Sequence, residues 1–110
     1  MPKGLNKVMI IGQLGRDPEM RYTPSGKAVT SFSVAVNQSW VSSDGEEQDT
    51  VEWFHVVAWG NLAEWCKGRL AQGSRVYVEG HLQTRAWQGE DLQPRHRTEL
   101  VAEEVIPLDE

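Results

Sequence analysis

Residues 51–72 read VEWFHVVAWGNLAEWCKGRLAQ, and within them a strand pattern gives way to a helix pattern. From Val51 to Trp59 successive side chains alternate between two faces, as they do in an extended strand. One face carries Trp53, His55, Val57 and Trp59, and the other carries Phe54, Val56 and Ala58. This segment therefore predicts a strand with two tryptophans and a histidine on a single face.

The second half of the stretch predicts the one helix of the chain. Apolar side chains recur there at helical spacing, at Leu62, Trp65, Cys66 and Leu70. Asn61 is a good N-cap residue, and Gly73 is a good stop signal. We therefore predict a helix over Asn61–Gln72, with Trp65 and Cys66 packed against the core.

Four further segments have the composition of strands: Lys7–Leu14, Val29–Asn37, Arg75–Trp87 and Arg95–Ile106. Turn-forming or polar stretches separate them at residues 23–26, 42–49 and 88–94. Gly12, inside the first strand, predicts a bulge or a sharp bend. Five strands with one helix after the third is the order of an OB-fold. The chain is thus expected to be mainly β, a five-stranded Greek-key OB-fold barrel with the helix between strands three and four.

Length and composition fit a single domain. The chain has 110 residues, of which 39% are hydrophobic and 25% are charged. We assign residues 1–107 to the barrel and residues 108–110 to a short acidic C-terminal end. No segment resembles a signal peptide or approaches the ~20 apolar residues that span a bilayer. Cys66 is the single cysteine, which excludes an internal disulfide, and we expect a cytoplasmic protein without membrane contact.

The formal net charge of -5 does not exclude a nucleic-acid partner. Five of the 16 acidic side chains lie in residues 99–110, which leaves 11 acids against 11 bases in residues 1–98. The local potential near a surface depends on charges within about 10 Å rather than on the total. The body of the protein can therefore carry a basic groove.

Four consecutive blocks of the sequence resemble the bacterial single-stranded DNA-binding protein family. They are GQLGRDPEMRYTPSG (12–26), SFSVAVNQSW (31–40), EWFHVVAWGNLAEW (52–65) and GSRVYVEGHLQTRAW (73–87). Each block alone is weak, but four in the correct order are specific. The resemblance implies a homotetramer, associated with the nucleoid, that binds and protects single-stranded DNA without sequence preference during replication, recombination and repair.

The resemblance also implies which side chains hold the DNA. The family places its stacking aromatics at the positions of Trp40, Trp53, Trp59 and Trp87, with Trp59 standing where relatives often have Phe. Arg21, His55 and Arg85 fall where relatives often carry DNA-contacting bases. Lys7 and Arg75 are further strand or near-strand cations that we expect along a phosphate track. Family members usually continue into an acidic tip that recruits replication and repair proteins, and these 110 residues lack it, so such recruitment is not predicted here.

The alternative for the tryptophans is burial in the core, which is the usual position of a large apolar side chain. Each strand already supplies a separate apolar face, and burying the opposite face as well would bury His55 and Arg85. We therefore expect Trp53, Trp59 and Trp87 to face outward. Trp40 lies an even number of residues from the inward-facing Phe32 on the same strand. It should therefore point inward unless a bulge intervenes.

Other function classes find little support in the residues. His55, His81 and His96 fall on different strands without a metal-ligand set, so no metal or cofactor is expected. Glu103 and Glu104 are neighbours on a strand and point to opposite faces, which disfavours an acid–base pair. We expect no catalytic residue and no enzyme. The alternatives are an adaptor of the same fold, similar to a primosomal accessory protein, and a nuclease, which would need a carboxylate cluster for a divalent metal.

Overall fold

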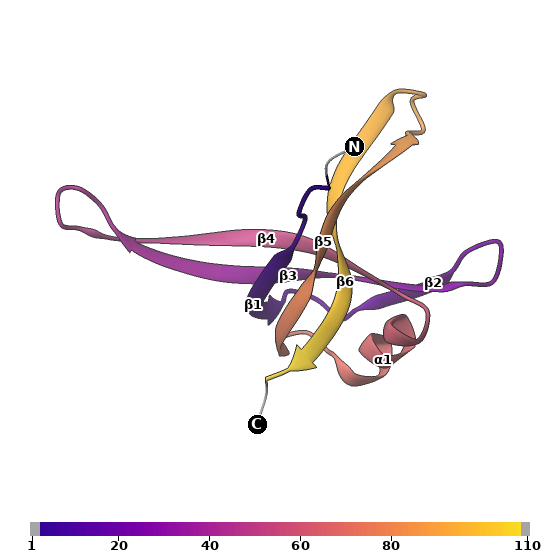
Figure 1. The fold of residues 1–110 in the computed structure, drawn as a ribbon, viewed down its shortest axis with the longest axis horizontal. Coiled ribbons are helices and arrows are strands. Elements are labelled where there is room, and N and C mark those ends of the chain that lie inside the picture. Colours follow the sequence, from indigo (N-terminus) through magenta and orange to yellow (C-terminus); the bar gives the residue numbers. More distant parts are fainter. Residues whose placement is uncertain (1–2, 109–110) are drawn as a thin grey trace.

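The structure is a computed structural model that describes residues 3–108. Within that range it contains six strands and one helix (Figure 1). In chain order these are β1 (Val8–Leu14), β2 (Glu19–Tyr22), β3 (Ala28–Val41), β4 (Glu47–Trp59), α1 (Asn61–Arg69), β5 (Arg75–Gln88) and β6 (Pro94–Pro107).

Five of the strands close into a barrel. The sheet runs in the order β1-β5-β6-β4-β3-β2, and an additional pairing of β1 with β3 closes the ring. The helix lies between the third and fourth barrel strands, so the predicted five-stranded barrel with one helix is confirmed. The sixth strand, β2, flanks β3 outside the ring. It was not predicted as a strand because a run of four residues, of which only Met20 and Tyr22 are apolar, is too short to be distinguished from the turns beside it.

Gly12 lies where the ring closes. A Cβ atom on this residue would come within 2.2 Å of the Ala35 carbonyl oxygen on β3. The predicted bulge is wrong, because β1 stays in continuous register with β5 from Val8 to Gln13, while the alternative of a sharp bend stays a prediction. The glycine instead permits the close approach of two backbones.

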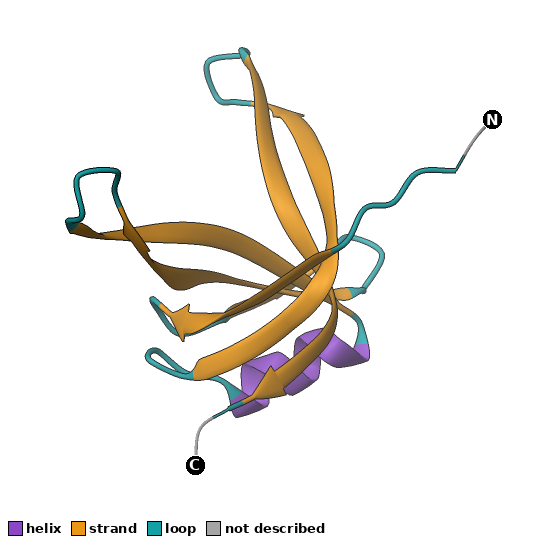
Figure 2. Ribbon diagram, turned by 60° about the vertical axis from the view of Figure 1, so that its left-hand side comes forward, coloured by secondary structure: helices purple, strands orange, loops and turns teal. Residues whose placement is uncertain are grey.

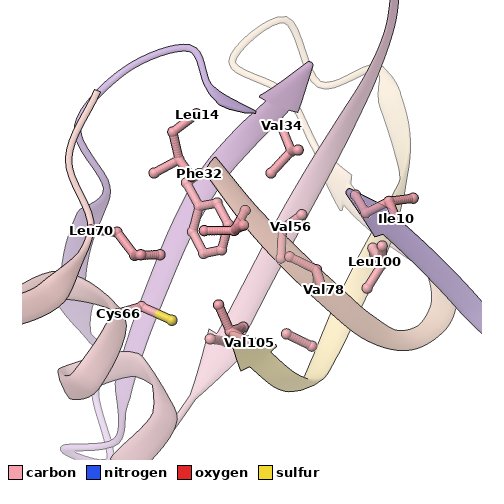
Figure 3. Close-up of a cluster of buried hydrophobic side chains, with 13 residues drawn as sticks. Ile10, Leu14, Phe32, Val34, Val56, Cys66, Leu70, Val78, Leu100 and Val105 are labelled. Carbon is pink, nitrogen blue, oxygen red and sulfur yellow. The ribbon is translucent and has the colours of Figure 1, made fainter. Parts of the chain in front are cut away.

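The core fills the barrel and extends to α1. It contains Ile10, Leu14, Phe32, Val34, Val56, Ala58, Cys66, Leu70, Val76, Val78, Leu100, Ala102 and Val105 (Figure 3). Trp65 packs against this cluster and Cys66 is fully buried, as predicted for both. The Thr30 hydroxyl donates a 2.7 Å hydrogen bond to the Ala63 carbonyl, which fastens α1 to β3.

The helix differs from its predicted bounds at both ends. Gly60, rather than Asn61, is the N-cap, and no side chain caps the helix. The helix ends at Arg69 because Leu70 has an extended backbone and points into the core. Gly73 lies beyond it in the turn before β5. Between residues 3 and 108 the structure shows no helix long and apolar enough to cross a membrane.

Two long hairpins diverge from the barrel (Figure 2). In one, β3 and β4 stay in register from Val29–Trp59 to Val41–Glu47, so the loop is shorter than the predicted 42–49. In the other, β5 and β6 pair as far as Gln88–Pro94. Strand β4 meets β6 at only two residue pairs, Val56–Leu100 and Val57–Val101. We call residues 35–54 the β3–β4 arm and residues 83–99 the β5–β6 arm.

Candidate nucleic-acid interface

A groove lies on the outer face of the barrel, where the two arms separate. It consists of two adjoining hollows of about 700 Å³ and about 190 Å³. Ser31 and His55 line both hollows, so the two hollows form one continuous surface. Among the predicted residues, Trp53 lines the larger hollow, and Arg21, Trp59 and Arg85 line the smaller one.

Trp53 forms a wall of the larger hollow. It lies on β4 opposite Ala35 of β3, and its side chain is exposed, with 59% of the residue surface accessible. The ring packs against the backbone of Gly15, because a Cβ atom there would lie 2.7 Å from its Cζ3 atom. The indole is therefore held by the loop after β1 while the residue remains accessible to a ligand.

His55 occupies the junction of the hollows among charged neighbours. Its Nε2 atom lies 3.4 Å from Glu99 Oε2 and 3.4 Å from Arg97 Nη1. Burial lowers the pKa of His55 below its ordinary value, and the Arg97 guanidinium lowers it further, against the opposing effect of Glu99. The ring is thus neutral at pH 7, when Nε2 can accept from Arg97. Once protonated, Nε2 donates to Glu99 instead.

Trp59 stands at the inner end of the groove beside two cations. Arg21, Val29 and Trp59 lie side by side on β2, β3 and β4. The Lys27 ammonium lies 5.5 Å from the centre of the Trp59 ring. An aromatic face and two positive charges therefore share one end of the groove.

Trp87 lies on the β5–β6 arm beneath two guanidinium groups. Arg85 is 4.7 Å and Arg97 is 5.9 Å from the centre of its ring. Arg85 also lines the smaller hollow and Arg97 the larger. Trp87 is therefore joined to the groove through its two arginines.

Trp40 lies apart from the other three aromatics. It pairs with Gln48 in an unbroken register, on the face of the hairpin that carries Val34 and Phe54, opposite to Trp53. No bulge intervenes, yet Trp40 is 51% exposed because it stands on the arm beyond the barrel. Its role in stacking stays a prediction.

Lys7 and Arg75 do not line either hollow. The Lys7 ammonium donates a 2.8 Å hydrogen bond to Glu79, which raises the pKa of the lysine, and the Tyr77 hydroxyl donates to the same carboxylate at 2.6 Å. Arg75 stands at the start of β5, and Trp87 stands near its other end. The groove thus gathers Arg21, His55 and Arg85 but not these two cations, whose contact with DNA stays a prediction.

The predicted site residues do not include Gly15, Lys27, Arg97 and Glu99, all of which lie at the groove or beside its aromatic rings. Arg97 and Glu99 could have been found by extending the alternation of faces into β6, where Arg95, Arg97 and Glu99 follow one another at every second position. The contact of Gly15 with Trp53 and that of Lys27 with Trp59 depend on tertiary packing. In residues 3–108 no three His, Cys, Asp or Glu side chains gather in a way that could hold a metal ion.

A comparison with known protein families shows which family this chain is similar to. The model described as "Single-strand binding protein family" matches residues 5–108. The chain belongs to this family. Among single-strand binding proteins, the "Single-stranded DNA-binding protein 1" of Chlorobaculum tepidum is 44% identical over 109 residues, which are 98% of this chain and 67% of that protein.

Solved structures of the family have the same fold. A Plasmodium falciparum SSB, determined as a complex with ssDNA, matches with a TM-score of 0.90 and 33% identity over 99% of both chains. A deletion mutant of the single-stranded DNA binding protein from Thermus aquaticus matches with a TM-score of 0.87 and 32% identity. That match covers 99% of this chain and 53% of the Thermus chain, so the present chain spans about half of that relative.

Proposed function

We propose that this protein binds and protects single-stranded DNA without sequence preference, through its groove and the two arms. One observation carries the proposal. Three exposed tryptophans, Trp53, Trp59 and Trp87, stand at or beside a groove that also holds Arg21, Arg85 and Arg97. Membership of the single-strand binding protein family and the likeness to a relative solved with ssDNA support it.

Stacking on these rings explains binding without sequence readout. Every base has a π face, and one base stacked on an aromatic side chain contributes roughly 1–3 kcal/mol, a range drawn from proteins of this same class. Unpaired bases can reach the rings, whereas the bases of a duplex are already stacked on one another. The protein should therefore prefer single strands over duplexes.

Phosphate contacts supply the remainder of the affinity. Arg21 and Arg85 line the smaller hollow beside Trp59, so a strand stacked there brings its backbone near both guanidinium groups. Each neutralised phosphate releases counterions, and affinity should fall as salt rises. The proposal involves no covalent chemistry and no cofactor.

A fluorescence titration tests the proposal directly. Oligo-dT should quench the tryptophan emission strongly, and duplex DNA of equal length should quench it little. An adaptor that has the fold but does not stack bases would leave the emission unchanged with both ligands. Absence of quenching by oligo-dT would therefore reject DNA binding by stacking.

We also propose that the protein is a homo-oligomer, and specifically a homotetramer. Ile11, Tyr77 and Ile106 lie side by side on the outer face of β1, β5 and β6, and Met9, on the same face, is 62% exposed. Such an apolar row across three strands favours contact with a second copy. Sedimentation equilibrium should give about four times the 12.4 kDa chain mass, and Ile11→Lys should lower that value.

The physiological setting that we propose is the nucleoid in the cytoplasm, where the protein covers strands exposed by replication, recombination and repair. Coverage should protect a strand from a single-strand nuclease and melt short hairpins. A nuclease-protection assay with oligo-dT checks this property. Cleavage at the rate of naked DNA under saturating protein would contradict it.

A further inference from the structure

Glu99 is a carboxylate in the smaller hollow of the groove, where the other charged lining residues are arginines. Its side chain is only 9% exposed, and it lines the smaller hollow together with Arg21 and Arg85. A negative charge at this place repels the phosphates of a bound strand, so on charge alone it should weaken binding. Its contacts indicate a different role.

Glu99 connects three strands at the point where the arms separate. Its Oε2 atom lies 3.4 Å from Nε2 of His55 on β4 and 3.4 Å from Nε of Arg85 on β5, while Glu99 itself belongs to β6. The last β4–β6 residue pair on this side is Val56–Leu100, one position away. The carboxylate is thus the next link between the strands after the backbone pairing ends.

Two arginines of the β5–β6 arm, one of them in contact with Glu99, place like charges side by side. Arg85 and Arg97 are cross-strand partners on the same face of the β5–β6 arm, an arrangement that like charges destabilise. Both guanidinium groups nevertheless lie over the ring of Trp87. Glu99 contacts Arg85 directly, so its negative charge offsets part of this repulsion.

We propose that Glu99 is a positioning residue for single-stranded DNA binding. It holds the Arg85 guanidinium between the groove and Trp87, so that this cation meets a phosphate without reorganising. A preorganised donor loses less side-chain entropy on binding than a free one. The inference rests on the proposed function, since it concerns how the same groove holds its ligand.

The main test is the affinity of Glu99→Gln for oligo-dT, measured by tryptophan quenching at fixed salt. If Glu99 positions Arg85, this variant should bind oligo-dT about 3- to 10-fold more weakly. That loss lies in the lower part of the range of interaction energies between residues in contact. Charge alone predicts the opposite, tighter binding with a steeper dependence on salt. The matched control is Glu103→Gln on the same strand, because Glu103 also pairs with a histidine, His81 at 3.2 Å, but outside the groove. It should bind like the parent.

A double-mutant cycle separates positioning from a general loss of structure. If Glu99 acts through Arg85, the cost of Arg85→Ala should be smaller in the Glu99→Gln background than in the parent, whereas independent effects would add. Thermal unfolding of each variant, without DNA, shows whether the fold is retained.

A second variant keeps the test decisive if Glu99→Gln does not fold. Arg85→Lys retains the charge at a partly exposed site and removes the planar guanidinium that Glu99 orients. If Glu99 positions the guanidinium, Arg85→Lys should lose a similar amount of DNA affinity. If Arg85 acts only as a point charge, the affinity should be unchanged. Equal or tighter binding by Glu99→Gln, or full affinity in Arg85→Lys, overturns the inference. If the parent protein itself fails to bind oligo-dT, the proposed function fails instead.

Discussion

The ring of Trp53 rests on the backbone of Gly15, and there is no room for a side chain between them. This contact joins the loop after β1 to the β3–β4 arm and fixes the orientation of a residue that is otherwise exposed. A glycine at position 15 is therefore part of the proposed DNA-binding surface, although it offers no side chain of its own.

Gly15→Ala should weaken binding to oligo-dT because its Cβ atom would push the indole out of its place. The loss should be smaller than the ~1–3 kcal/mol of a deleted stacking platform, since the ring remains present. Fluorescence titration measures it. Gly68→Ala in α1 is the matched control, since a Cβ atom there meets nothing within 4 Å, and its affinity should be unchanged.

Replacing the groove tryptophans should separate binding from folding. Trp53→Ala and Trp87→Ala should each cost roughly 1–3 kcal/mol of binding free energy, with little change in the melting temperature, because both rings are exposed. Trp65→Phe should lower stability and leave affinity intact, because Trp65 packs against the core. An equal loss of affinity in Trp65→Phe would contradict this division.

The dependence of DNA affinity on pH should carry the signature of His55. The pKa of the free protein's ring lies below 6.5, and phosphates nearby favour the protonated form, so affinity should rise as pH falls from 7.5 toward 5.5. His55→Gln should flatten this rise. His81 pairs with Glu103 outside the groove, so His81→Gln should retain the rise in affinity at low pH.

The free energy of unfolding of the DNA-free protein should also depend on pH through His55, but it should fall, not rise, as pH falls. The unfolded chain binds a proton at His55 near pH 6.5, and the folded chain binds it only at lower pH. The contribution of the neutral ring to the free energy of unfolding is therefore complete above pH 6.5 and declines as pH falls through that value. Denaturant titrations at pH 7.5 and pH 5.5 should show a smaller decline in His55→Gln than in the parent.

Cys66 should resist thiol reagents in the native state. The side chain is fully buried, and burial raises the pKa of its thiol to about 11, so thiolate is scarce at pH 8. Ellman's reagent should react only after unfolding in guanidinium chloride. Rapid reaction of the native protein would show that α1 opens from the barrel on the timescale of the assay.

Strand patterns in the sequence were sufficient for the barrel but not for all of its parts. Alternation in Val51–Trp59 and Arg75–Trp87 placed the strands and their outward faces because a core on one side enforces a period of two. β2 was missed because it has only four residues, and the cap at Gly60 was missed because it depends on backbone geometry rather than on a side chain.

The candidate site was predicted in outline for a similar reason. Parity put His55 with Trp53 and Trp59, but it could not show that β4 and β6 run side by side in parallel. That pairing joins residues more than 40 positions apart and brings Glu99 beside His55. Contacts of this kind arise from the closure of the barrel and leave no local signal in the chain.

Because β4 and β6 contact each other over only two residue pairs, each hairpin can change in length without disturbing the other. Apart from the pairing of Ala35 with Gln13 at the base of the β3–β4 arm, each arm is paired in backbone register only with itself. Two residues added to both strands of a hairpin would preserve the facing of every side chain and extend its reach by about 7 Å. The number of nucleotides covered by one copy could thus be adjusted by insertions near the loops, with the sequence of the barrel left unaltered.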